Sequence, residues 1–236
     1  MLSQTGRQGS ETAATVWKLT ELAEQSVRHT AACCGAVVTV ADAGAERRTT
    51  ATHPDLVALA AVQLAAGEGP ILTALDSGEP VDAWDLLAED RWPDYRAVAL
   101  DSGIRSAVTL PFRRSGIEVT LSLYSFRPGA LDDAVRGPVA LLGEQATANL
   151  VRERHYRAVL AEVDQLENAL RSRPVIDQAS GIVMHVLGCD AAEAFQILRR
   201  ISQRTNRKLA DVAEAVADSV GESGGSALEQ ELTRFA

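Results

Sequence analysis

Apolar residues recur at helical spacing in several long stretches of the chain. Within residues 11–29 they lie three or four positions apart, as on one face of a helix, and the same spacing returns over residues 54–66. Residues 86–102 look helical in parts, with Pro93 marking a start, and one long helical pattern covers residues 138–170. The pattern therefore predicts four helical regions before the last third of the chain.

Short β-branched or alternating runs lie between these helices, and several are followed by turn residues rich in Gly, Asp or Ser. The predicted strands are residues 36–40, 46–52, 80–84, 104–112 and 117–126. Residues 67–71, Gly-Glu-Gly-Pro-Ile, are predicted to form a turn. Because strands that are neighbours in sequence are joined by tight turns, we expect an antiparallel α+β sheet with helices on one or both faces. A doubly wound parallel sheet would instead alternate strand and helix strictly.

The last third of the chain predicts three amphipathic helices. Pro174 suits the first turn of the first helix, and Gly188 suits its C-terminal end. Asp190 and Glu193 have the spacing of a capping box at the start of the second helix, and Asn206 marks the break before the third. Their apolar positions are Ile176, Ala179, Val183, Val186 and Leu187, then Ala194, Phe195, Leu198 and Ile201, then Leu209, Val212, Ala213, Val216 and Val220. We expect a small all-α bundle of three helices.

The long central helix continues past the sheet domain with a heptad-like stripe. Its apolar members, spaced 3, 4, 3 and 4 residues apart, are Tyr156, Val159, Val163, Leu166 and Leu170. Such a stripe fits a parallel coiled coil joining two chains, and it equally fits an amphipathic helix packed on its own domain. Two heptads alone would be marginal. The order of the domains favours dimerisation.

Charge is distributed unevenly along the 236 residues. The whole chain has a formal charge of −9, which argues against non-specific nucleic-acid binding by the entire molecule. Residues 1–150 carry 12 basic and 19 acidic side chains, whereas residues 171–220 carry 7 and 6. Within residues 194–210 there are five basic side chains and no acidic one.

Several functional classes are not indicated by the sequence. The cysteines Cys33, Cys34 and Cys189 form no CxxC pair, the four histidines are isolated, and no metal site is expected. Free thiols, the lack of a signal peptide and the lack of an apolar run of 18 residues predict a cytoplasmic protein without a membrane span. Glycine-rich phosphate motifs and the G-x-S-x-G nucleophile motif do not occur, so we expect no enzyme.

The first domain resembles the GAF family. The resemblance rests on the element order and on the phrases GAVVTVADAG, LAAGEGPILTALDSGEPV and DRWPDYRAVALDSGIRSAVTLPF, and it covers roughly residues 14–150. It implies a module that senses a small molecule or mediates dimerisation and signalling. The Asn-Lys-Phe/Asp-Glu pattern of cyclic-nucleotide GAF domains is missing, so no cofactor is named and the ligand stays unknown. Trp84, Trp92 and Tyr95 are candidates to line a ligand pocket, and plain core packing is the alternative.

The last domain resembles the ANTAR family, the RNA-binding output module of bacterial transcription antiterminators. The shared positions are Ile176, Gln178, Ala179, Gly181, Ile182, Met184, Gly188, Cys189, Ala194, Phe195, Leu198, Arg199, Ser202, Gln203, Asn206, Lys208, Leu209, Val212 and Ala213. Many members carry Lys where this chain has Ser180, which implies one phosphate contact fewer.

The resemblance and the local chemistry select one set of RNA-binding candidates. Arginine planes, amides and hydroxyls are suited to splayed RNA loop bases, and small residues let a backbone approach the nucleic acid. The candidates are Ala179, Ser180, Met184, Arg199, Arg200, Ser202, Gln203, Asn206, Arg207 and Lys208. The alternative is a solvated basic face on a helical dimerisation bundle.

The sequence thus predicts a GAF–ANTAR regulator. Its expected parts are a disordered start (1–13), a GAF domain (14–150), a coiled-coil connecting helix (151–172), an ANTAR domain (173–220) and a flexible tail (221–236). The resemblance implies a homodimer that binds tandem hairpins in nascent transcripts, with no specificity for DNA. Two alternatives stay open: a sensor that signals through protein contacts without RNA binding, which Ser180 favours, and a kinase-like enzyme, for which no ATP-binding segment is found.

Overall fold

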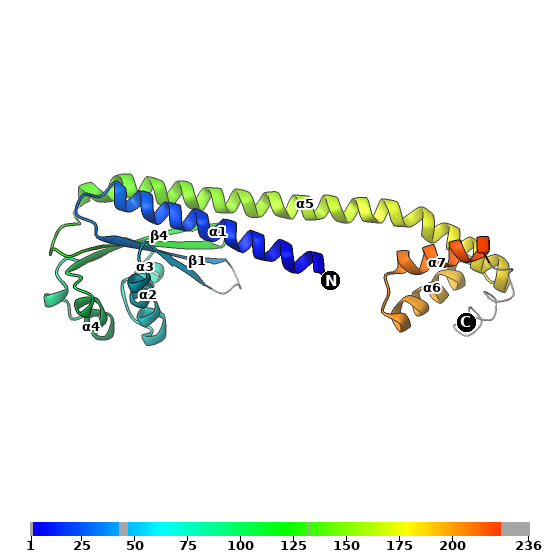
Figure 1. Cartoon of the computed structure of the whole chain (residues 1–236), viewed down its shortest axis with the longest axis horizontal. Helices are drawn as coiled ribbons and strands as arrows, with labels where there is room; N and C mark the ends of the chain where they lie inside the picture. The colour runs from blue at the N-terminus through cyan, green and yellow to red at the C-terminus, as the bar shows by residue number, and fades with distance from the viewer. Residues whose placement is uncertain (1, 43–46, 132, 223–236) are drawn as a thin grey trace. The chain divides into compact units, whose positions relative to one another are not determined.

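The computed structural model describes residues 2–42, 47–131 and 133–222 (Figure 1). The chain divides into two compact units, residues 1–155 and residues 156–236. Each unit is described by itself.

The first unit is built around one antiparallel sheet of five strands. Its strands are β1 (Gly35–Asp42), β2 (Arg48–Ala51), β3 (Val81–Ala83), β4 (Ser106–Arg114) and β5 (Ile117–Ser125), in the order β2-β1-β5-β4-β3. Every neighbouring pair is antiparallel. All five predicted strands and the antiparallel α+β class are therefore confirmed, with strand ends that differ by no more than two residues.

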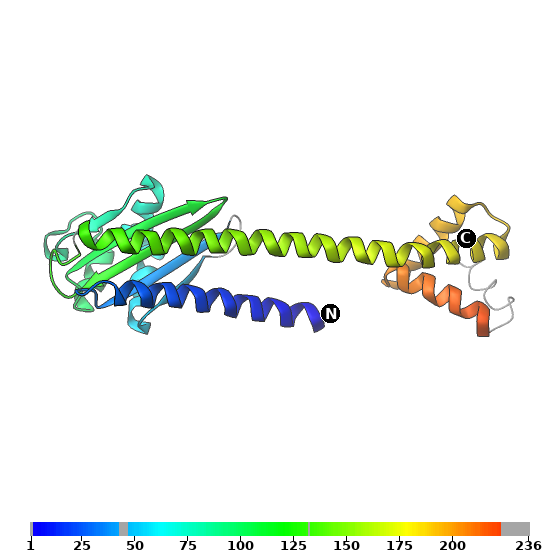
Figure 2. The ribbon, with the colours of Figure 1, turned by 90° about the horizontal axis from the view of Figure 1, so that it is seen from above.

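Helices cover both faces of this sheet (Figures 1 and 2). One face packs against α1 (Leu2–Arg28) and the first part of α5 (Asp133–Leu187), and the other packs against α2 (Pro54–Ala66), α3 (Pro70–Ser77) and α4 (Pro93–Asp101). A short 3-10 turn, η1 (Leu86–Ala88), also lies on the second face. Because successive strand residues point to opposite faces, Ala36 and Val38 join the first layer whereas Val37 joins the second.

Helix α3 is the element that the sequence did not predict. Residues 67–71 were expected to form a turn, and a turn is present, but a helix begins within it at Pro70. The buried side chain of Gln63 fixes this helix start, since its Oε1 accepts from Ile71 N at 2.8 Å and its Nε2 donates to Leu59 O at 2.7 Å. An eight-residue helix is too short to give a clear periodic pattern.

The N-terminus also differs from the expectation of disorder over residues 1–13. Helix α1 begins at Leu2, because this stretch contains no proline and its two glycines, Gly6 and Gly9, lower helix stability without breaking a helix. Met1 lies outside the described residues.

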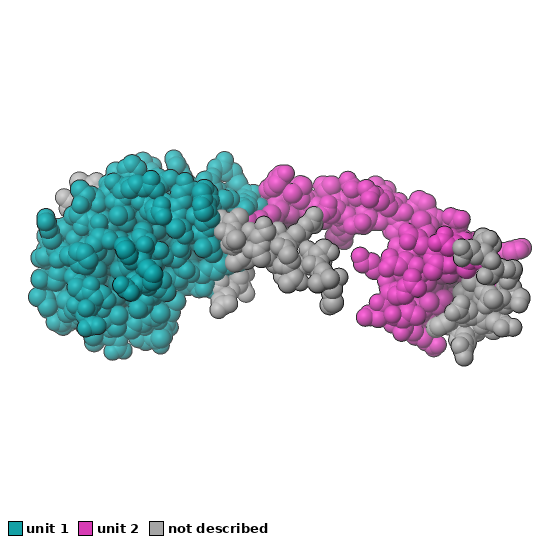
Figure 3. Space-filling model, in the orientation of Figure 1, with its two compact units in different colours: residues 1–155 teal, residues 156–236 magenta. Residues whose placement is uncertain are grey.

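The second unit, drawn in magenta in Figure 3, has a core formed by three helices. It consists of the last part of α5, α6 (Ala191–Thr205) and α7 (Leu209–Glu222). No separate helix begins at Pro174, because α5 runs unbroken from Asp133 to Leu187 and includes this proline. Proline has no backbone N–H, so α5 lacks one helical hydrogen bond at this position and continues past it. Most of the predicted tail lies outside the described residues, which end at Glu222.

No single described helix has both the length and the hydropathy of a span, while two bent pairs, α2 with α3 and residues 137–187 with α6, satisfy length and composition alone. The first of these pairs contributes its apolar side chains to the core beside the sheet.

The approach of α5 to the sheet depends on Gly143. A Cβ at this position would overlap the ring of Phe112 on β4, whereas a Cβ at Gly137, in the same helix, would meet nothing within 4 Å. We therefore expect Gly143→Ala to lower the free energy of unfolding of the first unit by about 1–3 kcal/mol through overpacking. Gly137→Ala should instead raise it by up to about 1 kcal/mol through helix propensity.

Urea unfolding followed by tryptophan fluorescence measures both changes, because Trp17, Trp84 and Trp92 all belong to the first unit. Equal effects of the two substitutions would contradict the close approach of α5 to Phe112.

Candidate nucleic-acid interface

The start of α6 is fixed by the predicted capping box. Glu193 N donates to Asp190 Oδ1 at 2.8 Å, and Asp190 N donates to Glu193 Oε2 at 3.3 Å. Gly188, with φ 63°, ends α5 in the left-handed conformation, and its N–H donates to Met184 O at 3.0 Å. Both helix ends were predicted from the sequence, and both are confirmed.

The turn between α6 and α7 is closed by Asn206, Arg207 and Ser202. Asn206 adopts φ 51° and ψ 33°, a left-handed conformation that Asn tolerates better than most residues. Arg207 N donates to Ser202 O at 3.2 Å, and Ser202 Oγ donates to Arg207 O at 2.7 Å. The Arg207 guanidinium donates to Asp211 O at 3.1 Å, which ties the turn to the start of α7.

The outward side of α6 carries cations and amides next to each other. Ala194, Ile197 and Leu198 are buried against the rest of the bundle, so the opposite side of the helix faces solvent. Arg199 and Gln203 are exposed and lie one turn apart on that side. Arg200 and Arg204, also exposed, lie one turn apart on the adjoining flank.

Asn206, Arg207 and Lys208 extend this surface into the turn, where all three are exposed. We call the set Arg199, Arg200, Gln203, Arg204, Asn206, Arg207 and Lys208 the basic surface. It holds five cations and two amides, and the segment that bears it, residues 194–210, contains no acidic side chain.

Gln196 is an exposed residue that the sequence reasoning missed. It precedes Arg199 by three positions and Gln203 by seven, which places it on the same side of α6. The spacing of seven residues was a sequence signal that could have identified it.

Two residues that were predicted to contact RNA, Ala179 and Ser202, are not part of the basic surface. Ala179 is fully buried in the core of the bundle, so its side chain cannot meet a nucleic acid from this position. Ser202 is half-buried, and its hydroxyl donates within the turn, so it supports the basic surface rather than forming part of it. On α5, Ser180 is half-buried and Met184 is 37% exposed, one turn further along.

The heptad-like stripe on α5 is exposed throughout. The exposed fractions are 64% for Tyr156, 42% for Val159, 44% for Val163, 58% for Leu166 and 73% for Leu170. Among the described residues of the second unit, none covers this apolar surface.

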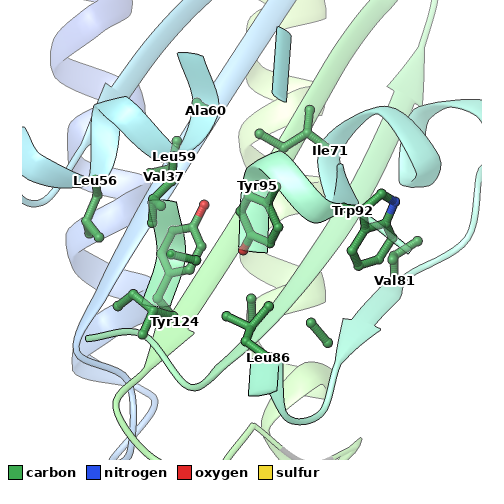
Figure 4. Close-up of a cluster of buried hydrophobic side chains, with 14 of the residues drawn as sticks. Val37, Leu56, Leu59, Ala60, Ile71, Val81, Leu86, Trp92, Tyr95 and Tyr124 are labelled. Atoms are coloured by element: carbon green, nitrogen blue, oxygen red, sulfur yellow. The ribbon is translucent and has the colours of Figure 1, made fainter. Parts of the chain in front are cut away.

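The aromatic residues predicted to line a pocket have different environments (Figure 4). Trp92 and Tyr95 are buried in the layer between the sheet and α2–α4, where their rings meet edge to face with centroids 6.3 Å apart. Trp92 Nε1 donates to Thr73 Oγ1 at 3.1 Å. Trp84 is 67% exposed and lies against Gly129 outside this layer, so it cannot line a cavity there.

Two tyrosine hydroxyls are buried in the same layer. Among the described residues, Tyr95 Oη and Tyr124 Oη have no partner at hydrogen-bonding geometry. Ser122, whose Oγ is paired with Thr109 Oγ1 at 2.8 Å, lies two positions before Tyr124 on the same face of β5. Burial raises the pKa of both phenols, so each carries its proton and is able to donate.

The thiols and acidic groups offer no comparable site. Burial raises the pKa of the Cys33 thiol, and burial together with Cys33 raises the pKa of Cys34 to about 11, so both are protonated and weakly nucleophilic. Cys33 Sγ lies 3.2 Å from Gly35 O. Over the described ranges, no three His, Cys, Asp or Glu side chains are grouped so as to hold a metal ion.

Comparison with known families finds a match in each of the two parts of the chain. The family model of the GAF domain matches residues 10–151, and the family model of the ANTAR domain matches residues 164–216. The first unit thus places the chain among sensor proteins of the GAF family. The chain belongs to this family and is a GAF–ANTAR regulator, in which a GAF domain is followed by an RNA-binding ANTAR domain of the antitermination class.

Solved structures resemble parts of the chain at low identity. A type II free methionine-R-sulfoxide reductase from Thermoplasma acidophilum is 14% identical, with 60% of this chain and 94% of that chain covered and a TM-score of 0.46. A GAF domain/HD domain protein from Geobacter sulfurreducens is 15% identical, with 59% and 94% covered and a TM-score of 0.42. An RNA-binding Light-Oxygen-Voltage receptor is 23% identical, with 85% and 52% covered and a TM-score of 0.27. No curated protein matches the chain.

The hydrogen bond from Ser202 to Arg207 gives a prediction about the turn. We expect Ser202→Ala to destabilise the α6–α7 turn by about 1 kcal/mol, since the hydrogen bond from the Ser202 hydroxyl to Arg207 O is lost. Hydrogen exchange of the amides in residues 202–212 should then accelerate about fivefold. Gln203→Ala is the control and should leave exchange unchanged, because this side chain is exposed. Equal amide exchange rates in both variants would show that the Ser202 hydroxyl does not stabilise the turn.

Proposed function

We propose that this protein is a transcription antitermination regulator that binds tandem RNA stem-loops through the basic surface of its ANTAR domain. The GAF domain controls this output in response to a small molecule. The observation that carries the proposal is the acid-free segment 194–210, whose exposed cations and amides lie on the outward side of α6, on its adjoining flank and in the turn after it.

The chemistry of the basic surface fits RNA loops better than a uniform duplex. Loop bases are unstacked, so they can be hydrogen-bonded on their edges by amides such as Gln203 and Asn206 and stacked on arginine planes such as that of Arg199. Lys208, Arg200 and Arg204 supply charge for the flanking phosphates. Gln196 adds a further amide on the same side of α6.

Ser180 stands where many ANTAR domains carry Lys, so we predict that α5 contributes less electrostatic attraction to RNA in this protein. Ser180 is half-buried, and Met184, one turn further along α5, is 37% exposed. These two side chains offer RNA a hydroxyl and an apolar contact rather than a charge. Affinity should then fall less steeply with salt than in relatives with Lys at this position, because fewer counterions are released.

The mechanism needs no catalysis. Two chains, joined along the exposed stripe of α5, present two ANTAR domains to two consecutive hairpins. Holding these hairpins raises the population of the RNA fold that excludes a competing terminator hairpin. Neither the GAF nor the ANTAR family is typically catalytic. The second candidate function is a sensor that signals through protein contacts alone, and Ser180 is the residue that favours it.

The buried phenols support a ligand role for the GAF domain. An unpaired buried hydroxyl is costly, and a ligand acceptor placed near Tyr95 would satisfy it. The surrounding side chains are aliphatic, among them Leu59, Ile71 and Leu86, as Figure 4 shows. We therefore expect a small, largely apolar ligand that carries at least one hydrogen-bond acceptor.

Substitutions in the basic surface test the RNA proposal. Arg199→Ala and Lys208→Ala should each weaken binding of a two-hairpin leader RNA by about 1 kcal/mol or more, which is about fivefold or more in Kd. Binding should also weaken with rising salt, and Lys208→Ala should reduce that salt dependence by about one phosphate contact. Filter binding of the full-length protein measures both quantities.

The matched control is Arg171→Ala, which removes one positive charge outside the basic surface, from an arginine paired with Glu167 at 3.6 Å. It should leave Kd within about twofold of the unmodified protein. If all three variants bind with the same Kd, the assigned surface is wrong. If neither the unmodified chain nor any variant binds the hairpins, the alternative of signalling through protein contacts is favoured.

The ligand proposal predicts opposite effects of one substitution on stability and on binding. Tyr95→Phe should keep or raise the Tm of the ligand-free protein, because a buried donor without a partner is removed. It should also abolish the rise in Tm that fractions of small metabolites produce in the unmodified protein. A large loss of stability in Tyr95→Phe would show that the hydroxyl already has a partner.

A further inference from the structure

Four arginines gather at one end of the sheet of the first unit. Arg113 and Arg114 end β4, Arg48 begins β2, and Arg47 directly precedes it. The antiparallel pairing of β2 with β1, of β1 with β5 and of β5 with β4 brings the start of β2 and the end of β4 to the same end of the sheet. We call Arg47, Arg48, Arg113 and Arg114 the arginine rim.

The arginine rim is only partly paired with acidic side chains. Arg47 Nη2 lies 3.5 Å from Glu118 Oε2, and Arg113 Nε lies 3.1 Å from Glu118 Oε1, so two guanidiniums share one carboxylate. Arg47 Nη1 is buried without a hydrogen-bond partner among the described residues. Arg48 and Arg114 are exposed, and neither forms an ion pair with any described residue.

A fifth arginine holds the hairpin that carries Arg114. Ser115 and Gly116 have φ values of 50° and 81°, which suits a tight two-residue turn between β4 and β5. Arg154, on α5, donates to Ser115 O and lies 2.6 Å from Asp42 Oδ1, so Asp42 is already engaged. The end of the hairpin is therefore fixed in position.

The balance of charge at this end of the sheet is positive. The arginine rim and Arg154 supply five guanidiniums, whereas the nearby acids of β1 and β5 are Asp42 and Glu118. Glu46 lies outside the described residues, and its inclusion still leaves more arginines than carboxylates. This end of the sheet should therefore attract anions.

This excess contrasts with the rest of an acidic domain. Residues 1–150 carry 12 basic and 19 acidic side chains, so acids are available to pair with most cations. Four other arginines of the first unit have a carboxylate of their own, namely Arg28, Arg91, Arg96 and Arg105, which pair with Glu24, Glu89, Asp90 and Asp85. The free guanidiniums of the arginine rim are instead available to an anion from outside the chain.

The geometry of the arginine rim favours an extended anion over a small one. Small anionic ligands are held in concave sites where several donors converge on one group. Arg48 and Arg114 are exposed and lie on β2 and β4, which are separated by β1 and β5. Because neighbouring strands lie about 4.8 Å apart, β2 and β4 are about 14 Å apart. A chain of phosphates can contact both strands at once, and each guanidinium can bind a phosphate through two hydrogen bonds.

We propose that the arginine rim is a second RNA-binding site, which contacts phosphates of the same transcript that the ANTAR domain binds. This inference rests on the proposed function, which supplies the RNA, and it extends RNA contact to the GAF domain. Phosphate contacts carry no information on base identity. The arginine rim therefore adds affinity without changing which loop sequence is recognised.

Removal of the two exposed arginines tests the proposal in the full-length protein. The double variant Arg48→Ala/Arg114→Ala breaks no ion pair with a described residue, so we expect its Tm to stay within about 2 °C of the unmodified chain. In filter binding with a two-hairpin leader RNA, its Kd should rise about tenfold. The slope of log Kd against log salt should fall by about 1.4, because two phosphate contacts are lost.

The matched control is the double variant Arg28→Ala/Arg127→Ala, which removes the same charge from the first unit. Arg28 ends α1 before β1 begins, and Arg127 follows the end of β5, so both belong to the opposite end of the sheet. This variant should keep Kd within about twofold of the unmodified chain. Equal weakening in the two double variants would overturn the proposal, because net charge alone would then explain the effect.

A second RNA with altered loop nucleotides distinguishes phosphate contacts from base contacts. Arg48→Ala/Arg114→Ala should weaken binding of the original and the altered RNA by the same factor, whereas Arg199→Ala should lose most of its effect on the altered RNA. An effect of Arg48→Ala/Arg114→Ala that depends on the loop sequence would contradict a phosphate contact at the arginine rim.

The set of variants separates this inference from the proposed function. Weaker binding in Arg199→Ala with unchanged binding in Arg48→Ala/Arg114→Ala would overturn the second site and leave the proposed function in place. Weaker binding in Arg48→Ala/Arg114→Ala alone would support the arginine rim and reject the basic surface. If the unmodified chain does not bind the RNA, both proposals are wrong.

Discussion

A helix that packs on a sheet buries only one side of itself, and α5 is subject to this constraint along its whole length. Its first part contributes Val139 to the core beside the sheet, and its last part contributes Ala179 and Val183 to the core of the bundle. Between these parts, the apolar side chains of the stripe from Tyr156 to Leu170 are exposed. The sensor domain, the output domain and the proposed dimer thus all depend on which side of one helix is buried at each point.

Long periodic patterns in the sequence predicted the fold well, because burial on one side of an element leaves a repeating signal. The five strands and helix α2 were found in this way, and the capping box at Asp190 and the left-handed end at Gly188 were found from residue types that favour helix ends. Short or interrupted elements were not. Helix α3 depends on the buried amide of Gln63, which lies outside it, and α5 continues through Pro174 although proline usually marks a helix start. The start of α3 and the continuation of α5 through Pro174 both depend on tertiary contacts, which the helix propensities of single residues do not describe.

The candidate site was predicted as a segment more accurately than as a set of side chains. The acid-free stretch around α6 is exposed as expected, yet Ala179 is in the core and Ser202 is engaged within the turn. Small or hydroxyl-bearing residues in such a motif serve packing and turn geometry as readily as binding, and composition cannot distinguish these uses. The same holds for Trp84, Trp92 and Tyr95, which are close in sequence but differ in burial. The two phenols in the GAF interior became apparent only once Tyr124, from a distant strand, was seen to share a layer with Tyr95.

The separation of charge within the chain has a consequence for how an RNA target is found. A cell contains a large excess of RNA, and a protein with positive charge over its whole surface would spend most of its time on unrelated transcripts. Here the net charge of −9 discourages loose association at a distance, whereas residues 194–210 attract phosphate only once they are close to it. Encounters that do not place α6 against a loop should be short, so selectivity arises partly from rapid rejection of incorrect transcripts.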